Sequence, residues 1–209
     1  MNQTKGMFLS LEGSEGVGKT TSLNYIQEFI ESLGHRVLIT REPGGTPMAE
    51  ELRNILLSER EEKVEANTEL LLMFASRCQH VSQVIKPALD SGTWVICDRF
   101  VDASFAYQGG GRELGFSRIE QLEKWCLGDF KPDLTLLLDM SVEEGIARTK
   151  KRGKADRFET EKMAFYERIR AAYLRRAEED PERIHVVDAT PDIATVQRSL
   201  KHILQQHCV

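Results

Sequence analysis

The sequence predicts an α/β protein in which helices cover both faces of a central parallel β-sheet. Short apolar runs alternate with longer segments of helical periodicity along the whole chain, and this alternation is typical of βαβ units. Several of the apolar runs are nearly continuous, as expected for parallel strands that are buried on both faces. A glycine-rich turn also joins the first strand to the first helix. Strands are therefore expected at 7–11, 36–40, 93–97, 134–138 and 184–187.

The first half of the chain begins with the strand at 7–11, which runs straight into the glycine-rich turn. Beyond the turn, apolar residues recur at helical spacing from Leu23 to Leu33, and Gly34 stands where a helix C-cap is expected. Glycine and proline residues at 41–47 then interrupt the periodic pattern. The other elements expected in this half are a strand at 36–40, a helix at 48–57, a polar passage at 58–66 and a long helix at 67–89.

In the second half, two apolar strands lead directly into acidic residues, Asp98 and Asp139. The carboxyl ends of parallel strands lie at one edge of a sheet, where open α/β folds bind ligands, so these carboxylates are expected near the glycine-rich turn. Ser141 and Glu144 have the spacing of a capping box and open a helix that continues to about residue 151. The remaining elements expected are a glycine-containing connection at 100–112 and helices at 117–127, 162–178 and 192–205.

The composition favours a single domain over 1–209, because 41% of the 209 residues are hydrophobic and can form one core. The amino terminus is polar and no apolar run approaches the length of a membrane span, which predicts a cytoplasmic protein without membrane contact. A net charge of −5 disfavours a nucleic-acid-binding groove. The five histidines show no paired ligand spacing and are assigned no role. Reduced thiols are expected at Cys78, Cys97, Cys126 and Cys208.

Residues Gly13–Thr20 match the phosphate-binding pattern G-x-x-x-x-G-K-[ST]. Glycines allow the backbone to curve around an oxyanion with its N–H groups pointing inward, and the helix that follows adds the positive end of its dipole. Lys19 supplies a positive charge, and the hydroxyl of Thr20 is a ligand for Mg²⁺. The pattern favours a nucleoside-triphosphate site over an ordinary glycine turn. Its expected lining is Gly13, Ser14, Glu15, Gly16, Val17, Gly18, Lys19, Thr20 and Thr21.

A guanine-reading Asn-Lys-x-Asp motif is absent from the sequence, which argues against a switch GTPase. Over nearly its full length the sequence instead resembles the thymidylate kinases, which are P-loop nucleoside-monophosphate kinases. The resemblance rests on ordered motifs that together are far more specific than the phosphate-binding loop alone. They are Leu11-Glu12-Gly13 before the loop, Thr40–Thr46, Asp98-Arg99-Phe100, Ser104 with Ala106–Gly109, and an arginine-rich segment that leads to Asp156-Arg157-Phe158.

The resemblance implies a P-loop NTPase-type three-layer sandwich, with a central five-stranded parallel sheet and a mobile lid at about 148–161. It also implies transfer of a phosphoryl group from Mg²⁺-ATP to dTMP, giving ADP and dTDP for dTTP biosynthesis, by a homodimeric protein. ATP and Mg²⁺ are then the cofactors, and dTMP and ATP are the small-molecule partners. Two alternatives stay open, namely another nucleoside-monophosphate kinase and a regulator that binds ATP without an acceptor.

By the same resemblance, four side chains are assigned to the phosphates and the metal. Arg99 is expected to hold the acceptor phosphate, since a guanidinium forms bidentate bonds to phosphate oxygens; the alternative is a structural ion pair with Asp98. Asp98 and Glu12 are expected to hold Mg²⁺, directly or through water, and to contact the acceptor sugar. Arg53 is expected to be a second contact to the acceptor phosphate, or else an exposed helical arginine.

The family stacks a phenylalanine on thymine and binds a thymine carbonyl with an arginine one helical turn later. Phe74 and Arg77 match these roles, but the commoner spacing in the family is one residue longer and would place Met73 over the base. Core packing is the alternative for Phe74. Ser104 and Gln108 are expected at the edge of the base. Tyr107 is expected against C2′ of the sugar, with a core aromatic as the alternative.

The charged segment 148–161 is expected to be a lid over the transferring phosphoryl group, or else a solvated surface. The interior of the phosphate-binding loop, 14–17, contains no arginine. The lid is therefore expected to supply the catalytic cation, as in the bacterial branch of the family. The expected catalytic residues are Lys19, Arg99, Arg152 and Arg157, and the adenine ring is expected near 188–190.

Overall fold

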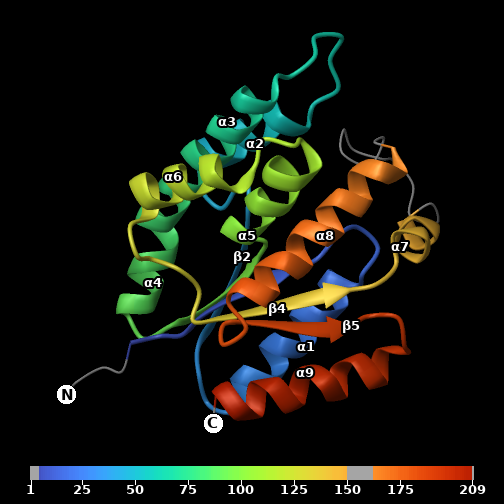
Figure 1. Cartoon of the computed structure of the whole chain (residues 1–209). Coiled ribbons are helices and arrows are strands. Elements are labelled where there is room, and N and C mark those ends of the chain that lie inside the picture. The colour runs from blue at the N-terminus through green and yellow to red at the C-terminus, as the bar shows by residue number, and fades with distance from the viewer. Residues whose placement is uncertain (1–4, 150–161, 209) are drawn as a thin grey trace.

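Within the residues that the structure describes, 5–149 and 162–208, the computed structural model contains a five-stranded sheet in the order β2-β3-β1-β4-β5 (Figure 1). All neighbouring strands in it run parallel. The five predicted strands are confirmed, and each ends one residue later than expected. The strands are β1 (Phe8–Glu12), β2 (Val37–Arg41), β3 (Trp94–Asp98), β4 (Leu134–Asp139) and β5 (Ile184–Asp188).

Alternate side chains of β1 point into two different cores. Leu9 and Leu11 pack in a cluster with residues of α1 (Lys19–Ser32) and α9 (Ile193–His207), whereas Phe8 packs into the opposite layer. Figure 1 shows α1 and α9 together on one face of the sheet. Because both faces of the central strands are buried, these strands are apolar almost throughout. The predicted three-layer sandwich is therefore confirmed.

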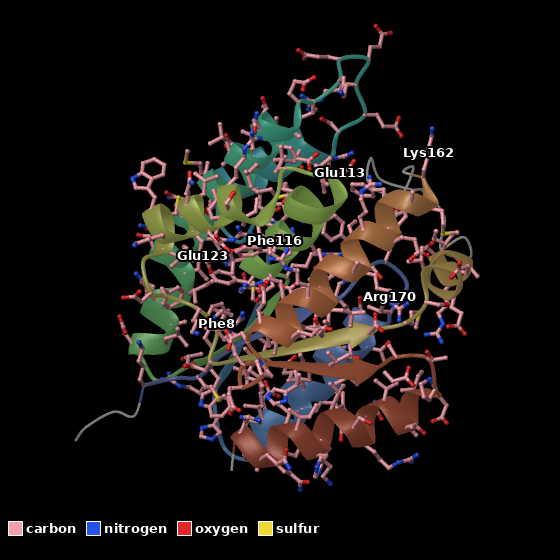
Figure 2. The ribbon with its side chains drawn as sticks, in the orientation of Figure 1. Phe8, Glu113, Phe116, Glu123, Lys162 and Arg170 are labelled. Carbon is pink, nitrogen blue, oxygen red and sulfur yellow. The ribbon has the colours of Figure 1, made fainter. Side chains whose placement is uncertain are left out.

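The second helical layer covers the face of the sheet on which Phe8 lies. The centroid of the Phe8 ring is 4.9 Å from that of Phe100, edge to face, and 5.5 Å from that of Phe130, which it stacks on. Figure 2 shows Phe8 in the interior between the sheet and these helices. The layer includes α2 (Pro47–Leu57), α3 (Ala66–His80), α6 (Phe116–Leu127) and α8 (Met163–Glu179).

No helix in the described part of the chain is long and apolar enough to cross a lipid bilayer.

The long helix predicted at 67–89 is one continuous helical run that changes type in its second half. The run is α-helical to His80, π-helical over η1 (Val81–Ile85), and α-helical again over α4 (Lys86–Asp90). Pro87 has no N–H to donate to the carbonyl of Gln83, and its ring crowds that carbonyl, so the regular α-helical hydrogen bond cannot form there. The wider π-helical turn lies just before this proline, and apolar periodicity alone does not reveal it.

The three consecutive glycines lie in a helix and not in an open connection. α5 (Val101–Ser104) continues into the π-helical segment η2 (Phe105–Gly111), which packs along α8. A Cβ atom at Gly110 would lie 2.7 Å from the Cβ of Ala172 and 2.8 Å from the carbonyl oxygen of Arg168. Glycine therefore allows η2 to approach α8 closely, which fixes the position of the polar side chains that η2 carries.

The helix predicted to open at Ser141 is confirmed as α7 (Val142–Thr149). Ser141 Oγ donates a hydrogen bond to Glu144 Oε2 at 2.9 Å, and Glu144 N donates to Ser141 Oγ at 3.3 Å. Ser141 therefore caps the helix as predicted, but the Glu144 carboxylate accepts from the Ser141 hydroxyl and not from its backbone N–H, so only one half of the predicted capping box is formed. The expected lid at 148–161 falls almost entirely outside the described residues, and so do Arg152 and Arg157.

Candidate active site

A cavity of about 270 Å³ opens at the carboxyl ends of the strands, beside the turn between β1 and α1. β1 lies between β3 and β4, so the cavity occupies the edge at which open α/β sheets bind ligands. The predicted site residues that line it are Glu15, Gly16, Val17, Gly18, Lys19, Thr20, Arg53, Arg77, Asp98, Arg99, Ser104, Tyr107 and Gln108. The predicted site residues that are not part of its lining are Glu12, Gly13, Ser14, Thr21 and Phe74.

The turn after β1 requires glycine at particular positions. Gly13 and Gly16 have φ angles of 135° and 80°, and a Cβ atom at either residue would collide with a backbone carbonyl, that of Leu138 or that of Gly145. Gly18, with φ 89°, precedes the first residue of α1 and makes no side-chain cap. The first N–H groups of α1 therefore keep their hydrogen-bonding capacity for an anion at this end of the cavity.

Lys19 extends back across the loop. Its Nζ donates to the carbonyl oxygens of Gly13 and Ser14 at 3.0 and 3.1 Å. Burial, with a further contribution from the charge of Arg99, lowers the pKa of Lys19 from 10.5 to about 8. An anion in the loop would stabilise the charged ammonium, so Lys19 is suited to hold a phosphate group.

Glu15, in the interior of the loop, joins the loop to the rest of the cavity. Its Oε1 accepts from Arg99 Nη2 at 3.0 Å and from the hydroxyl of Tyr107 at 2.6 Å. Its Oε2 is buried without a hydrogen-bond partner among the described residues. From the sequence, Glu15 was expected only to line the loop. A carboxylate is unexpected inside a loop whose pattern predicts anion binding, and this could have indicated that Glu15 pairs with a cation such as Arg99.

Arg99 lies between the two ends of the cavity, at the first position after β3. Its backbone has φ 69°, which is uncommon for a residue other than glycine, and its guanidinium lies 4.6 Å from the Tyr107 ring centroid. It also donates to the hydroxyl of Tyr173 at 3.2 Å. The alternative ion pair with Asp98 is not formed, since the carboxylate that pairs with Arg99 is that of Glu15.

Asp98 and Thr20 provide oxygen atoms of the kind that Mg²⁺ prefers. Asp98 Oδ1 is buried and has no hydrogen-bond partner in the described part of the chain. Thr20 stands in the first turn of α1, and both residues line the cavity. Mg²⁺ is usually held by one or two protein oxygens together with phosphate oxygens and water, so these residues fit the ion.

Glu12 lies behind the cavity wall and does not face the cavity. Its Oε1 accepts from the backbone N–H of Phe100 at 2.6 Å, and its Oε2 accepts from the hydroxyl of Tyr173 at 2.7 Å. Burial raises its pKa from 4.5 to about 8, with a further contribution from the charge of Asp102. The expectation that Glu12 contacts metal or sugar is therefore corrected. Glu12 fixes the chain where it leaves β3, because its carboxylate binds the backbone N–H of Phe100.

Arg77 is buried in the wall opposite the loop and is held by three partners. Its Nε donates to Glu42 Oε2 at 2.6 Å, its Nη1 to Ser104 Oγ at 3.0 Å and its Nη2 to the carbonyl oxygen of Phe100 at 3.0 Å. A guanidinium has five N–H groups in a rigid plane. These contacts fix the plane and leave one N–H on each terminal nitrogen for a ligand.

A second row of buried side chains supports Arg77. His80 Nδ1 lies 3.0 Å from Glu42 Oε1, and because the carboxylate accepts, Nδ1 donates. His80 Nε2 is hydrogen-bonded to Thr40 Oγ1 at 2.6 Å. Glu42 and His80 also lie near Cys97, but burial raises the pKa of that thiol well above its usual value, which disfavours a metal thiolate. His80, to which the sequence assigned no role, therefore belongs to the support of the site.

The structure brings Met73, and not Phe74, to the cavity. Met73 is part of its lining, whereas Phe74 is 2% exposed and belongs to the core around Phe8. The Phe74 ring lies 4.8 Å from the guanidinium carbon of Arg77 and supports it from the core side. The expected stacking role of Phe74 is thus corrected in favour of the core alternative, because a shift of one position on a helix turns a side chain by about 100°.

The remaining predicted residues of this wall come from α5, η2 and α2. Ser104 and Gln108 are almost fully buried and reach the cavity, and Tyr107 presents its ring there. Gln108 Nε2 donates to Glu69 Oε1 at 2.8 Å. Arg53 Nη1 donates to the carbonyl oxygen of Pro43 at 2.9 Å and also lines the cavity, so it is not simply an exposed helical arginine.

The start of the charged segment contacts the connection after β5. Arg148 donates to the carbonyl oxygens of Ala189 and Thr190 at 3.1 and 3.0 Å. This contact lies where the adenine ring is expected. Arg170 extends from α8 toward the end of β4 (Figure 2) and makes two hydrogen bonds of 2.8 Å to Asp139. Asp139, which was expected at the ligand-binding edge, is therefore engaged in an ion pair.

Comparisons with known proteins identify the family of the chain. A family model described as thymidylate kinase matches residues 11–200. A thymidylate kinase of Hahella chejuensis is 54% identical over 94% of each chain, and one of Pseudomonas fluorescens is 51% identical over 95% of each chain.

Among solved structures, the thymidylate kinase of Ehrlichia chaffeensis superposes with a TM-score of 0.77 at 33% sequence identity. The match covers 96% of this chain and 99% of that chain. The similarity therefore extends over the whole sheet and both helical layers, and not only over the phosphate-binding loop. A sequence and a fold that are similar over nearly the full length show that this protein belongs to the thymidylate kinase family.

Proposed function

We propose that the protein transfers the γ-phosphoryl group of Mg²⁺-ATP to dTMP, giving ADP and dTDP. The observation that carries the proposal is the arrangement of a single cavity. It has a phosphate-binding loop at one end, a wall of fixed polar side chains at the other, and Arg99 between them. Membership of the thymidylate kinase family supports dTMP as the acceptor.

At the donor end, the loop residues 13–18 and the first turn of α1 would bind the β- and γ-phosphates of ATP through backbone N–H groups. Lys19 would exchange its contacts with the loop carbonyls for phosphate oxygens. This exchange should cost little free energy, because the carbonyls of Gly13 and Ser14 already hold the ammonium close to the loop. Thr20 and Asp98 would hold Mg²⁺, which would neutralise negative charge on the phosphates of ATP.

In the middle of the cavity, Arg99 would hold the phosphate of dTMP, with Arg53 as a second contact. Glu15 and Tyr107 already fix the Arg99 guanidinium, so little conformational entropy remains to be lost on binding. The acceptor oxygen is anionic before the reaction and needs no strong general base. Catalysis then depends on bringing two polyanions together in line and neutralising their repulsion.

At the far end, Arg77 would donate to a carbonyl of the base, and Ser104 and Gln108 would contact its edge. The support for this comes from the rigid network around Arg77, which presents its remaining N–H groups in a fixed plane. Met73 would cover the ring of the base, because it lines the cavity next to Arg77. Tyr107 would pack against C2′ of the sugar.

Three further properties complete the proposal. Arg152 and Arg157 would supply cations over the equatorial phosphoryl oxygens, because the interior of the phosphate-binding loop contains no arginine. A lid at 148–161 would exclude water that could otherwise accept the phosphoryl group.

The chain would act as a single domain over 1–209 in a cytoplasmic homodimer, with dTMP and ATP as its small-molecule partners.

The proposal is tested by measuring ADP release at a fixed concentration of Mg²⁺-ATP with dTMP, dUMP, UMP, GMP and AMP in turn. We expect dTMP to give the largest kcat/KM. A larger value for GMP or AMP would identify another monophosphate kinase. ADP release that is independent of every acceptor would overturn the kinase assignment altogether.

A further inference from the structure

We propose that Glu69 is a positioning residue that fixes the orientation of the Gln108 side-chain amide. It thereby selects bases that present a carbonyl oxygen next to a ring N–H. This inference rests on the proposed function and extends it to one determinant of acceptor specificity. Glu69 belongs to α3 and Gln108 to η2, so the contact joins two elements that meet only in the folded chain.

Glu69 is a buried carboxylate with charged and neutral partners. It is 0% exposed, and its Oε1 accepts from Gln108 Nε2 at 2.8 Å. Arg112 Nε lies 3.3 Å from each of the two carboxylate oxygens. The Arg112 guanidinium in turn lies 4.7 Å from the ring centroid of Phe165 on α8. Glu69 is therefore an ion-paired acceptor whose position is set from two sides.

This contact decides which end of the Gln108 amide faces the cavity. A carboxylate that is paired with a guanidinium only accepts hydrogen bonds, so the NH₂ group of Gln108 must point toward Glu69. The carbonyl oxygen, Oε1, then points away from Glu69. Gln108 lines the cavity, and its Oε1 accepts no hydrogen bond from any residue in the described ranges. The site therefore presents an acceptor at this position.

The same wall presents a donor, because Arg77 lines the cavity and bonds to Ser104, which lies four residues before Gln108 on the same helical run. Arg77 keeps one N–H on each terminal nitrogen after its bonds to Ser104 and to the carbonyl of Phe100. A donor beside an acceptor is complementary to the O4 and N3–H of thymine or uracil, and to the O6 and N1–H of guanine. Cytosine and adenine carry an amino group and an unprotonated ring nitrogen there, so both positions would be mismatched.

A flipped Gln108 amide would lose this selection. With NH₂ toward the cavity, Gln108 would meet N3–H of thymine donor to donor but would suit the bare N3 of cytosine. Glu69 prevents the flip because the amide oxygen would then face a carboxylate oxygen at hydrogen-bond distance. The buried carboxylate thus acts on the base through Gln108 without touching the base.

The test compares Glu69→Gln with wild type and with the control Glu65→Gln. A carboxamide at position 69 has the same shape as the carboxylate but can donate as well as accept, so both orientations of Gln108 become available. Glu65 is an exposed residue at the N-cap position just before α3, and its change removes the same charge close to the start of that helix. Binding constants of dTMP, dUMP and dCMP are measured by calorimetry without ATP, and kcat and KM are measured for dTMP.

We expect Glu69→Gln to weaken dTMP and dUMP binding by about tenfold and to leave dCMP binding unchanged or improved. The ratio of dTMP to dCMP affinity should therefore fall by at least about tenfold, while kcat with dTMP changes by less than about twofold. Glu65→Gln should keep the wild-type ratio. An equal loss for all three nucleotides, or an unchanged ratio in Glu69→Gln, would overturn the inference.

A measurement on the wild-type protein keeps the inference testable if Glu69→Gln does not fold. In nitrogen-15 NMR spectra, the side-chain amide protons of Gln108 should exchange slowly with water and should show no contact with bound dTMP. A contact between these protons and the base would overturn the inference. Absence of dTMP-dependent ADP release by wild type would instead overturn the proposed function, so the two failures are distinguishable.

Discussion

The two ends of the cavity are built in different ways. The proposed phosphate end is lined by one contiguous stretch, residues 15–20, and offers mainly backbone N–H groups and one lysine. The base end combines side chains from the segment after β2, from α3, from α5 and from η2, and each is held by another buried side chain. One end is therefore local in sequence and the other depends on distant contacts.

This difference predicts how each end responds to change. Backbone donors are set by glycine conformation and by the start of a helix, so they serve any triphosphate in the same way. The base end depends on a chain of contacts from Thr40 through His80 and Glu42 to Arg77. Changes at the phosphate end should lower turnover for every acceptor, whereas changes at the base end should alter acceptor affinity and stability.

The largest effect is expected for Lys19→Ala, which removes a charge contact that strengthens as the phosphoryl group is transferred. We expect kcat to fall by about a thousandfold with dTMP as acceptor and by a similar factor with dUMP. Steady-state ADP release with each acceptor measures kcat. Turnover within tenfold of wild type, or a loss restricted to one acceptor, would contradict the assignment of Lys19 to the phosphate end.

The next largest effect is expected for Glu42→Ala. This change leaves the buried guanidinium of Arg77 without its carboxylate and His80 without its acceptor. We expect a loss of about 3 kcal/mol in the free energy of unfolding, measured by urea denaturation, and an increased KM for dTMP with little change in the KM for ATP. The control is Glu65→Ala, which removes an exposed ion pair with Lys63 and should change stability by less than about 0.5 kcal/mol.

A pH titration sharpens the comparison through Lys19. Its pKa in the empty site is about 8, below its usual value, so the charged form that binds phosphate is lost as pH rises through 8. The KM for ATP should increase about tenfold between pH 7 and pH 9, while kcat stays nearly constant because bound phosphate restores the charge. The KM for dTMP should change little, since Arg99 keeps its charge. A flat KM for ATP over this range would contradict the lowered pKa.

The smallest effect is expected for Thr40→Val, at the far end of the contact chain that supports Arg77. The change removes the hydroxyl that is hydrogen-bonded to His80 Nε2 and keeps the side-chain shape. We expect the free energy of unfolding to fall by about 1 kcal/mol, which is the usual contribution of one buried hydrogen bond. The KM for dTMP should rise about twofold to threefold. An increase in the KM for ATP instead would show that the two ends are not independent.

Much of the fold could be predicted because its determinants are local. The apolar runs that form the strands, the helix cap at Ser141, and the glycines of the loop after β1 each depend on a few neighbouring residues. The π-helical turn before Pro87 and the helical nature of η2 were missed. The π-helical turn reflects the proline within the helix, and the helical form of η2 accompanies its close packing on α8; apolar periodicity reports neither.

At the site, the sequence by itself determined which chemical groups stand at the carboxyl ends of the strands, because the apolar runs that form the strands and the glycine-rich pattern are both local in sequence. Only the tertiary structure decided that Met73 faces the cavity and Phe74 the core, and that Glu12 supports the chain behind the wall. It alone joined Glu15 to Arg99 and Glu69 to Gln108. Side-chain hydrogen bonds between residues far apart in the chain leave no periodic signal, since each partner is specified only by where the backbone brings it.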